Sequence, residues 1–257
     1  MLKSRIQQGF AQSQALHHFP ADTFPSVHPV DWLHSHFAVG GWSPLQRLGN
    51  MLTAHMTQIA PHSGFTWHPH RGLEIYTWVL EGTIHHEDTT GGKGDIRAGE
   101  LQRMFSGEWI EHQELNQTDQ PVRVIQIWFV ADPTYIELPP HYEQVDQSDL
   151  PTYRSDTATT YHLIGAESPV ESHVDARIAA TVVAPGGTTP FEPPAADEDL
   201  FLYVTDGQGW LRNADDEAAL GQYDVILARH DAPAATFTAG STPLHFLSFY
   251  LPRFLSE

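Results

Sequence analysis

Short runs of apolar and β-branched residues alternate with turn-forming residues along most of this 257-residue chain. Seven such runs predict strands, at residues 75–82, 96–105, 122–130, 177–185, 199–207, 223–229 and 244–251. Clusters rich in glycine, proline and polar residues separate several of them, at 89–95, 116–121, 184–190 and 238–243. Short strands at this spacing are typical of sandwiches and barrels. We therefore predict an all-β fold, since the weakly amphipathic stretch at 3–15 is too irregular to predict a helix.

The two halves of the chain resemble each other. Residues 60–82 align with residues 184–207, and both segments begin with Ala-Pro and a glycine-containing turn. Both also end in an apolar run that is closed by an acidic residue and a glycine. Two further matches follow in the same order, 97–104 with 220–227 and 121–130 with 243–252. Such an ordered series predicts an internal repeat.

A polar, proline-bearing segment at 132–157 lies between the two repeats and reads as a linker. We therefore expect an N-terminal β domain over residues 1–131 and a C-terminal β domain over residues 158–257. The chain is long enough for each domain to have its own core.

Two pairs of metal-ligand side chains lie in the first repeat. His68 and His70 are two residues apart, and His112 and Glu114 share that spacing. Residues i and i+2 of an extended strand face the same side, so each pair points one way, and two such pairs on facing strands converge inside a barrel. Three imidazoles and one carboxylate suit a borderline divalent ion such as Fe(II), Mn(II), Ni(II), Cu(II) or Zn(II). An octahedral ion would keep open positions for water, substrate or dioxygen.

Other candidates nearby are weaker. His34 and His36 form another H-x-H pair, but no further ligand completes it, and an isolated pair is more often a surface or pocket feature. His86 either lines the pocket or holds a turn with Asp88, and the turn is the favoured interpretation. Glu74 is interpreted as a structural residue, or as one that supports the ligands.

The second repeat lacks these ligand types. Counting back from its end places Pro193 and Ala195 opposite the two N-terminal histidines. The other pair falls near Thr236 and Thr238, where loops of unequal length leave the register open. None of these side chains replaces an imidazole at a metal, so we expect a site in the first repeat only.

Composition narrows the function further. The formal charge is −19, from 13 basic and 32 acidic residues, so direct contact with nucleic acid is not expected. The absence of cysteine excludes disulfides, thiolate metal sites and cysteine nucleophiles. No run is apolar enough for a signal peptide or a membrane span, which leads us to expect a cytoplasmic protein without membrane contact.

Several motifs follow one another from residue 68 onward. They are an H-P-H-R-G-x-E opening, a V-L-E-G strand end, an H-x-D-x-x-G turn, a G-E-L-Q-x-M strand and a closing H-x-E. In this order they resemble the pirin family of the cupin superfamily. The resemblance is strong over roughly residues 60–130 and faint in the second half.

The resemblance implies a bicupin, with two tandem cupin-type β-barrels of the jelly-roll or double-stranded β-helix kind. It implies metal in the N-terminal barrel only, held by His68, His70, His112 and Glu114. The usual metal would be one Fe(II), although the family is permissive, and Mn, Ni, Cu, Co and Zn are alternatives.

One departure from the family pattern lies just before the last ligand pair. Pirins often have G-x-G-I there, whereas residues 107–110 of this chain read Gly-Glu-Trp-Ile. Trp109 either packs against the barrel or narrows the mouth of the pocket.

The resemblance also implies an activity, flavonol (quercetin) 2,3-dioxygenase, with a small flavonol-like aromatic substrate and O2. Glu114 would act as general base while the three histidines hold the metal. The alternative is a non-catalytic iron protein that senses redox state and acts through a protein partner. A purely structural metal is a third interpretation, less favoured because closed structural sites are usually zinc and often thiolate-rich.

Overall fold

The computed structural model describes residues 15–255. Within that range the regular structure consists of 22 strands and two short 3-10 helices, which confirms the predicted all-β class. The stretch at 3–15, considered above for a helix, lies outside the described residues except for its last position. No helix in the described part of the chain is long and apolar enough to cross a membrane.

Contacts divide the chain into two compact units. The first barrel comprises Pro25–Leu150 and the short segment Pro169–Val174. The second barrel comprises Pro151–Ser168, the described residues up to Phe24 and the described residues from Asp175 onward. Each unit therefore includes a segment from the opposite half of the sequence.

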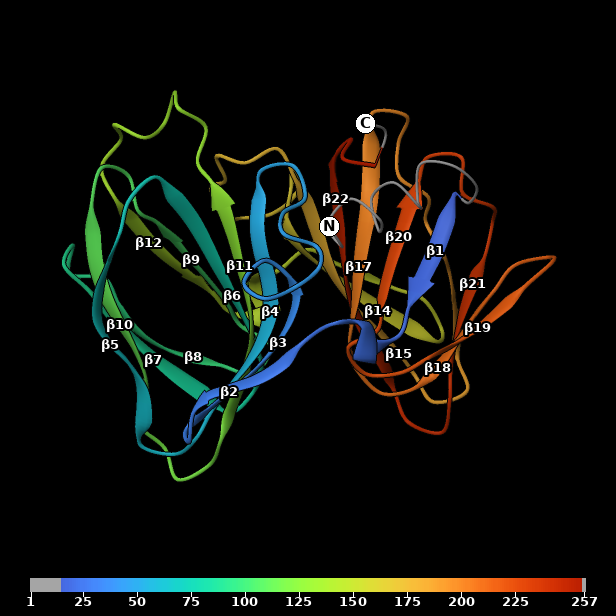
Figure 1. Ribbon diagram of the computed structural model, residues 1–257, viewed down its shortest axis with the longest axis horizontal. Helices are drawn as coiled ribbons and strands as arrows, with labels where there is room; N and C mark the ends of the chain where they lie inside the picture. Colours follow the sequence, from blue (N-terminus) through green and yellow to red (C-terminus); the bar gives the residue numbers. More distant parts are fainter. Residues whose placement is uncertain (1–14, 256–257) are drawn as a thin grey trace. The chain divides into compact units, whose positions relative to one another are not determined.

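The first barrel has a seven-stranded sheet in the order β12-β9-β6-β11-β4-β3-β2 and a four-stranded sheet in the order β5-β10-β7-β8. Figure 1 shows these two sheets as opposite walls of the barrel. Its elements are β2 (Ser26–Val30), β3 (Leu33–Val39), β4 (Met51–Ile59), β5 (Ser63–His70), β6 (Leu73–Glu81), β7 (Thr83–Asp88), β8 (Lys93–Arg97), β9 (Leu101–Phe105), β10 (Ile110–Asn116), β11 (Val122–Val130), β12 (His141–Val145) and η2 (Gln147–Asp149).

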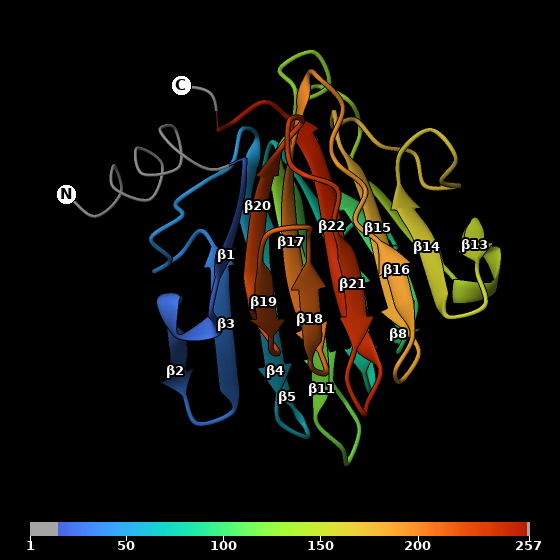
Figure 2. The same cartoon turned by 90° about the vertical axis from the view of Figure 1, so that its right-hand side faces the viewer.

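The second barrel repeats this design, with a seven-stranded sheet in the order β1-β20-β17-β22-β15-β14-β13 and a four-stranded sheet in the order β16-β21-β18-β19. Figure 2 shows the smaller sheet lying over the larger one. Its elements are β1 (Leu16–Phe19), η1 (Ala21–Thr23), β13 (Thr152–Arg154), β14 (Ala158–Ile164), β15 (Arg177–Val183), β16 (Thr188–Pro190), β17 (Glu198–Asp206), β18 (Gly209–Arg212), β19 (Glu217–Leu220), β20 (Val225–Arg229), β21 (Thr236–Ala239) and β22 (Leu244–Pro252).

The strand orders of the two barrels correspond position by position, as the internal repeat predicts. Strand β6 takes the place of β17, β11 that of β22, and β10 that of β21. In the first barrel the outer strand beside β9 is β12, which follows the first repeat in the sequence. In the second barrel the outer strand beside β20 is β1, which precedes the first repeat in the sequence. Contacts thus group the residues differently from the boundaries expected at 131 and 158, because the segment at 132–157 contains the paired strands β12 and β13.

One predicted strand is wrong in its extent. The run at 96–105 is divided into β8 and β9 by a turn at residues 98–100. Gly99 occupies this turn with φ of +84°, a conformation that favours glycine, and its N–H donates to the carbonyl oxygen of Val79. The other six predicted runs coincide with strands to within a few residues.

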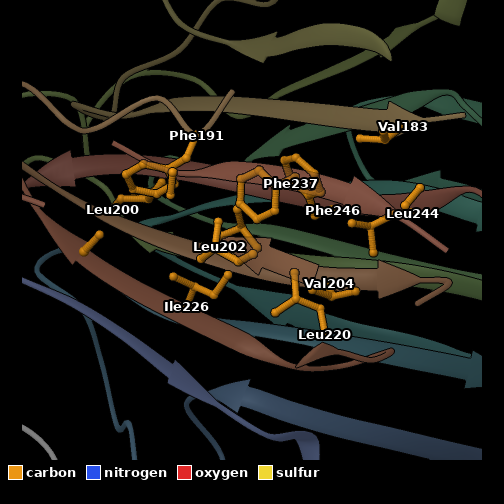
Figure 3. Packing of buried hydrophobic residues seen from close by; sticks show 14 of the residues in the cluster. Val183, Phe191, Leu200, Leu202, Val204, Leu220, Ile226, Phe237, Leu244 and Phe246 are labelled. Carbon is orange, nitrogen blue, oxygen red and sulfur yellow. The ribbon is translucent and has the colours of Figure 1, made fainter. Parts of the chain in front are cut away.

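The interiors of the two barrels differ in polarity. The second contains one large apolar cluster, and Figure 3 shows Phe191 and Leu200 at one end of it with Phe237, Phe246 and Leu202 in the middle. The first has two separate apolar clusters, one with Val79, Val122 and Val124 and one with Ile75, Met104 and Ile110. Between these positions on β6 and β11 the inward residues are polar, and the candidate site lies there.

Candidate metal centre

Strands β5 and β10 pair antiparallel and bring the two predicted ligand pairs together. His112 lies opposite His68 in the register, and Ile110 lies opposite His70. A bulge between His112 and Glu114 then shifts the pairing. Gly64 permits this close approach, because a Cβ at its position would lie 2.3 Å from the backbone oxygen of Glu114.

The three predicted histidines form one cluster. Their ring centroids are 4.3 Å apart for His68 and His112, 5.0 Å for His68 and His70, and 5.0 Å for His70 and His112. One candidate ligand atom from each ring lies within 4.8 Å of the others. His112 is only 1% exposed, whereas His68 and His70 are half-buried, so the cluster is reached from the β5 side.

The protonation of the cluster suits metal binding. His68 Nδ1 lies 2.8 Å from the carbonyl oxygen of Thr66, which only accepts, so Nδ1 donates and the neutral tautomer of this ring has its lone pair on Nε2. Burial, with the nearby His68, lowers the pKa of His70 to about 4. Burial and the surrounding histidines lower the pKa of His112 to about 2. The lowered pKa values of His70 and His112 make these two imidazoles neutral donors near neutral pH.

Two ring nitrogens in this cluster are buried without a hydrogen-bond partner in the described structure. They are Nε2 of His70 and Nε2 of His112. A buried polar atom without a partner is costly unless something binds it. Neutral imidazole nitrogens converging at this spacing fit a divalent transition metal.

The fourth predicted ligand, Glu114, is 3% exposed and lies beside the cluster. Its Oε2 accepts a 2.8 Å hydrogen bond from the Gln126 amide, and its Oε1 lies 3.5 Å from the Thr77 hydroxyl. A carboxylate oxygen of Glu114 lies within 4.8 Å of ligand nitrogens of His86 and His112. The structure therefore presents two overlapping groups that share His112, rather than one group of four.

His86 lies closer to the candidate ligands than the sequence indicates. Its side chain is fully buried, its Nδ1 lies 3.5 Å from Nδ1 of His112, and its ring stacks on Tyr142 at 4.5 Å. Its Nε2 also hydrogen-bonds Asp88 Oδ2 at 3.0 Å, so His86 both lines the interior and braces the turn. Burial alone would raise the pKa of Asp88, but hydrogen bonds from His86 and Thr90 outweigh it and lower that pKa to about 2.

A row of inward polar residues crosses the larger sheet behind the site, and the sequence reasoning missed it. Gln126 on β11 pairs with Thr77 on β6, which pairs with Gln102 on β9. Gln102 is fully buried, and neither its amide nitrogen nor its oxygen has a partner in the described structure. The signal that could have revealed this row is the presence of glutamine within strand runs that are otherwise largely apolar.

Residues 34–129 match the Pirin family model. A pirin-like protein of Solanum lycopersicum is 26% identical over 80% of this chain and 72% of its own length. These matches support assignment of the chain to the pirin family. A Mycobacterium tuberculosis relative, whose quercetin 2,3-dioxygenase name is provisional, is 40% identical over 103 residues. That match covers 42% of the length of the relative.

Solved pirin structures share the bicupin fold. Escherichia coli YhhW in complex with nickel(II) superposes with a TM-score of 0.75 at 23% identity, covering 92% of this chain and 99% of YhhW. A quercetin 2,3-dioxygenase from Acinetobacter baumannii has a TM-score of 0.76 at 20% identity, covering 93% of this chain and 79% of its own. At these identities the likeness establishes the fold, two tandem cupin barrels, and nothing finer.

Other predicted residues lie away from the cluster. Glu74 lies one residue along β6 from the inward Ile75, so it faces the opposite side of the sheet. There it is fully buried and forms a 2.7 Å ion pair with Arg103, which shows a structural role. Trp109 is 54% exposed and so does not pack into the barrel. His34 hydrogen-bonds Ser26, and neither metal-compatible group in the described residues includes it.

The second barrel is apolar where the first carries the cluster. Glu114 pairs with His86, four residues after Gly82, and Phe237 pairs with Leu211, four residues after Gly207. The counterpart of Glu114 is thus the buried Phe237, one position from the expected Thr236 or Thr238, which are less buried. Both metal-compatible groups among the described residues lie in the first barrel.

Proposed function

We propose that this protein is a metal-dependent dioxygenase that opens the ring of a flavonol-like aromatic with O2. The observation that carries the proposal is the pair of buried, unpartnered Nε2 atoms of His70 and His112 beside His68. The dioxygenase names of the mycobacterial and Acinetobacter proteins support the reaction class. The nickel complex of YhhW supports a divalent metal at the site.

In this proposal His68, His70 and His112 hold one divalent ion, most suitably Fe(II), and Glu114 completes the set. The two oxygens of Glu114 are held unequally. Its Oε2 is fixed by Gln126 at 2.8 Å, whereas Oε1 has only a long 3.5 Å contact to Thr77. The Oε1 atom is therefore the one able to turn toward an ion or a substrate proton.

A bound divalent ion supplies positive charge that stabilises the 3-hydroxylate of a flavonol. Glu114 Oε1 accepts the proton of that hydroxyl, and Gln126 keeps the carboxylate aimed at it. Trp128 lies 5.1 Å from the ring of His70 and packs against the apolar cluster of Ile75, Met104 and Ile110. This wall suits a flat aromatic ring and excludes water from one of its faces.

The overall reaction is balanced without a further reductant. The flavonol takes up both atoms of dioxygen, its central ring opens, and one ring carbon leaves as carbon monoxide. The proton taken up by Glu114 returns to the ring-opened product.

The test combines metal content with turnover. Purified protein loaded with Fe(II) without air is given quercetin and O2, and flavonol loss, oxygen uptake and carbon monoxide release are measured together. We expect equal amounts of all three. His70→Ala should lose metal, Glu114→Gln should keep metal and lose turnover, and His34→Ala, from the H-x-H pair outside the cluster, should keep both.

Metal-loaded protein that leaves quercetin unchanged would refute the dioxygenase. If its partners in a pull-down then depended on the oxidation state of iron, the non-catalytic regulator would replace it. Turnover that survives in His70→Ala would instead show that the reaction does not use this cluster.

A further inference from the structure

The second barrel contains a cavity of about 380 Å³, although it has no metal-compatible cluster among its described residues. This volume is in the range of small-molecule sites, which are mostly apolar with a few placed polar groups. Its apolar lining comes from β17, β22 and β21 and from the residue after β16, and it contains several aromatic rings. It includes Phe191, Leu200, Leu202, Phe237, Phe246 and Tyr250.

Polar side chains share the inner face of the larger sheet with the apolar residues of β17 and β22. On the inner side of the larger sheet, Thr160 pairs with Thr181, and their hydroxyls lie 2.9 Å apart. One step along, Ala179 separates His162 from Ser248 in the register. Within residues 15–255 the structure shows no hydrogen bond for the His162 imidazole or the Ser248 hydroxyl. Donors and acceptors are therefore available to a bound molecule.

The charge around the cavity disfavours an anion. Arg177, at the edge, is bound to Glu198 through two hydrogen bonds of 3.0 and 2.6 Å, and its guanidinium lies 4.3 Å from the centre of the Tyr250 ring. Its charge is thus compensated. Glu167 and Glu192 line the same cavity and add negative charge. A carboxylate or phosphate entering here would find no unpaired cation.

The cavity is not a remnant of the metal centre. Gln126 lies four residues after Val122 at the start of β11, and Ser248 lies four residues after Leu244 at the start of β22. Ser248 therefore stands where the first barrel has the glutamine that holds its carboxylate. The counterpart of that carboxylate is Phe237. Most of the polar groups of this cavity lie instead on β14 and β15.

We propose that the second barrel binds a neutral, flat ring compound that carries one or two hydroxyl or carbonyl groups. The aromatic side chains of the lining contact the ring faces, and Thr160, Thr181, Ser248 and His162 bind the polar substituents. Binding at this site needs no metal and is independent of the proposed dioxygenase reaction.

The test titrates the full-length protein with 2-naphthol, a neutral ring with one hydroxyl, by isothermal calorimetry. We expect saturable binding of one equivalent in wild type and unchanged binding in His70→Ala, which removes the metal centre. The anion 2-naphthoate should bind more weakly. Ala179→Leu, which fills the cavity between His162 and Ser248, should remove saturable binding.

Thr181→Val keeps the shape of the side chain and removes one hydroxyl. It therefore tests the proposed ligand site if Ala179→Leu does not fold. It should weaken 2-naphthol binding about three- to tenfold. The matched control is Thr159→Val, since Thr159 neighbours Thr160 on β14 and faces the other side of the sheet. Its affinity should equal that of wild type.

Three results would overturn the proposal. They are no saturable 2-naphthol binding, binding that is unaffected by both Ala179→Leu and Thr181→Val, and binding that is lost in His70→Ala. Only the last would assign the ligand to the metal centre, so failure here remains distinct from failure of the dioxygenase.

Discussion

The side-chain amide of Gln126 on β11 donates a 2.8 Å hydrogen bond to Oε2 of Glu114 on β10. The orientation of the amide is fixed because its oxygen accepts a 2.9 Å bond from the indole N–H of Trp128, which only donates. The carboxylate is thus held from the opposite wall of the first barrel. A residue that touches no proposed metal ion sets the direction of the proposed base.

Replacing Gln126 by leucine should lower flavonol turnover by about 10- to 100-fold, because residues that orient ligands have effects of this size. Metal content should remain near that of wild type, since the three histidines are unchanged. Gln58→Leu is the matched control, because Gln58 on β4 faces away from the interior. Equal turnover in Gln126→Leu and Gln58→Leu would show that the bond has no role in the reaction.

Asp88→Asn should alter how the stability of the metal-free protein depends on pH. Hydrogen bonds lower the pKa of Asp88 from its ordinary 3.8 to about 2, so its stabilising effect is present above about pH 4 and is lost as the pH falls toward 2. Between about pH 5 and pH 2, wild type should lose about 1 kcal/mol more unfolding free energy than Asp88→Asn, allowing for solvent screening. Urea unfolding across this range measures the difference, with the exposed Asp146→Asn as control. Parallel curves for wild type and Asp88→Asn would contradict the expectation.

The buried ion pair outside the site gives a prediction about stability alone. Arg103→Leu leaves Glu74 buried without its cation and should cost about 3–5 kcal/mol of unfolding free energy, measured by urea denaturation. Removing both charges with Glu74→Leu and Arg103→Leu together should recover part of this loss. The folded protein should bind metal as wild type does. Loss of metal from a stably folded Arg103→Leu protein would show that this network supports the cluster.

Phe237→Ala tests the corresponding position of the second barrel. Phe237 is 2% exposed and belongs to the large apolar cluster, so truncation should cost about 3 kcal/mol of unfolding free energy. Metal content should not change, because the candidate ligands all lie in the first barrel. Thr236→Ala, an exposed neighbour on the same strand, should stay within about 0.5 kcal/mol of wild type. A cost for Phe237→Ala no larger than that of the control would argue against the packing of Phe237 in this cluster.

The sequence predicts the strands, the internal repeat and the convergence of His68, His70 and His112, because alternation and i, i+2 spacing are local properties of a strand. It does not predict the hydrogen bond between Gln126 and Glu114 or the pairing of Gln102 with Thr77, since both depend on the register of strands far apart in the chain. The split of 96–105 was missed because the turn at Gly99 separates two strands that belong to different sheets. The alignment of Phe237 with Glu114 was missed because it differs by one residue from the register expected by counting. His86 was assigned to a turn, and the turn is there, but burial against Tyr142 is a tertiary effect.

The segment Pro169–Val174 belongs to the first barrel although it follows most of that barrel by many residues. There the hydroxyl of Ser172 lies 2.9 Å from that of Tyr76, and the backbone N–H of His173 donates to the carboxylate of Glu74. The described residues before Phe24 belong in turn to the second barrel. No single cut in the chain therefore yields two complete barrels. A recombination event at the middle of the gene would therefore transmit neither barrel whole.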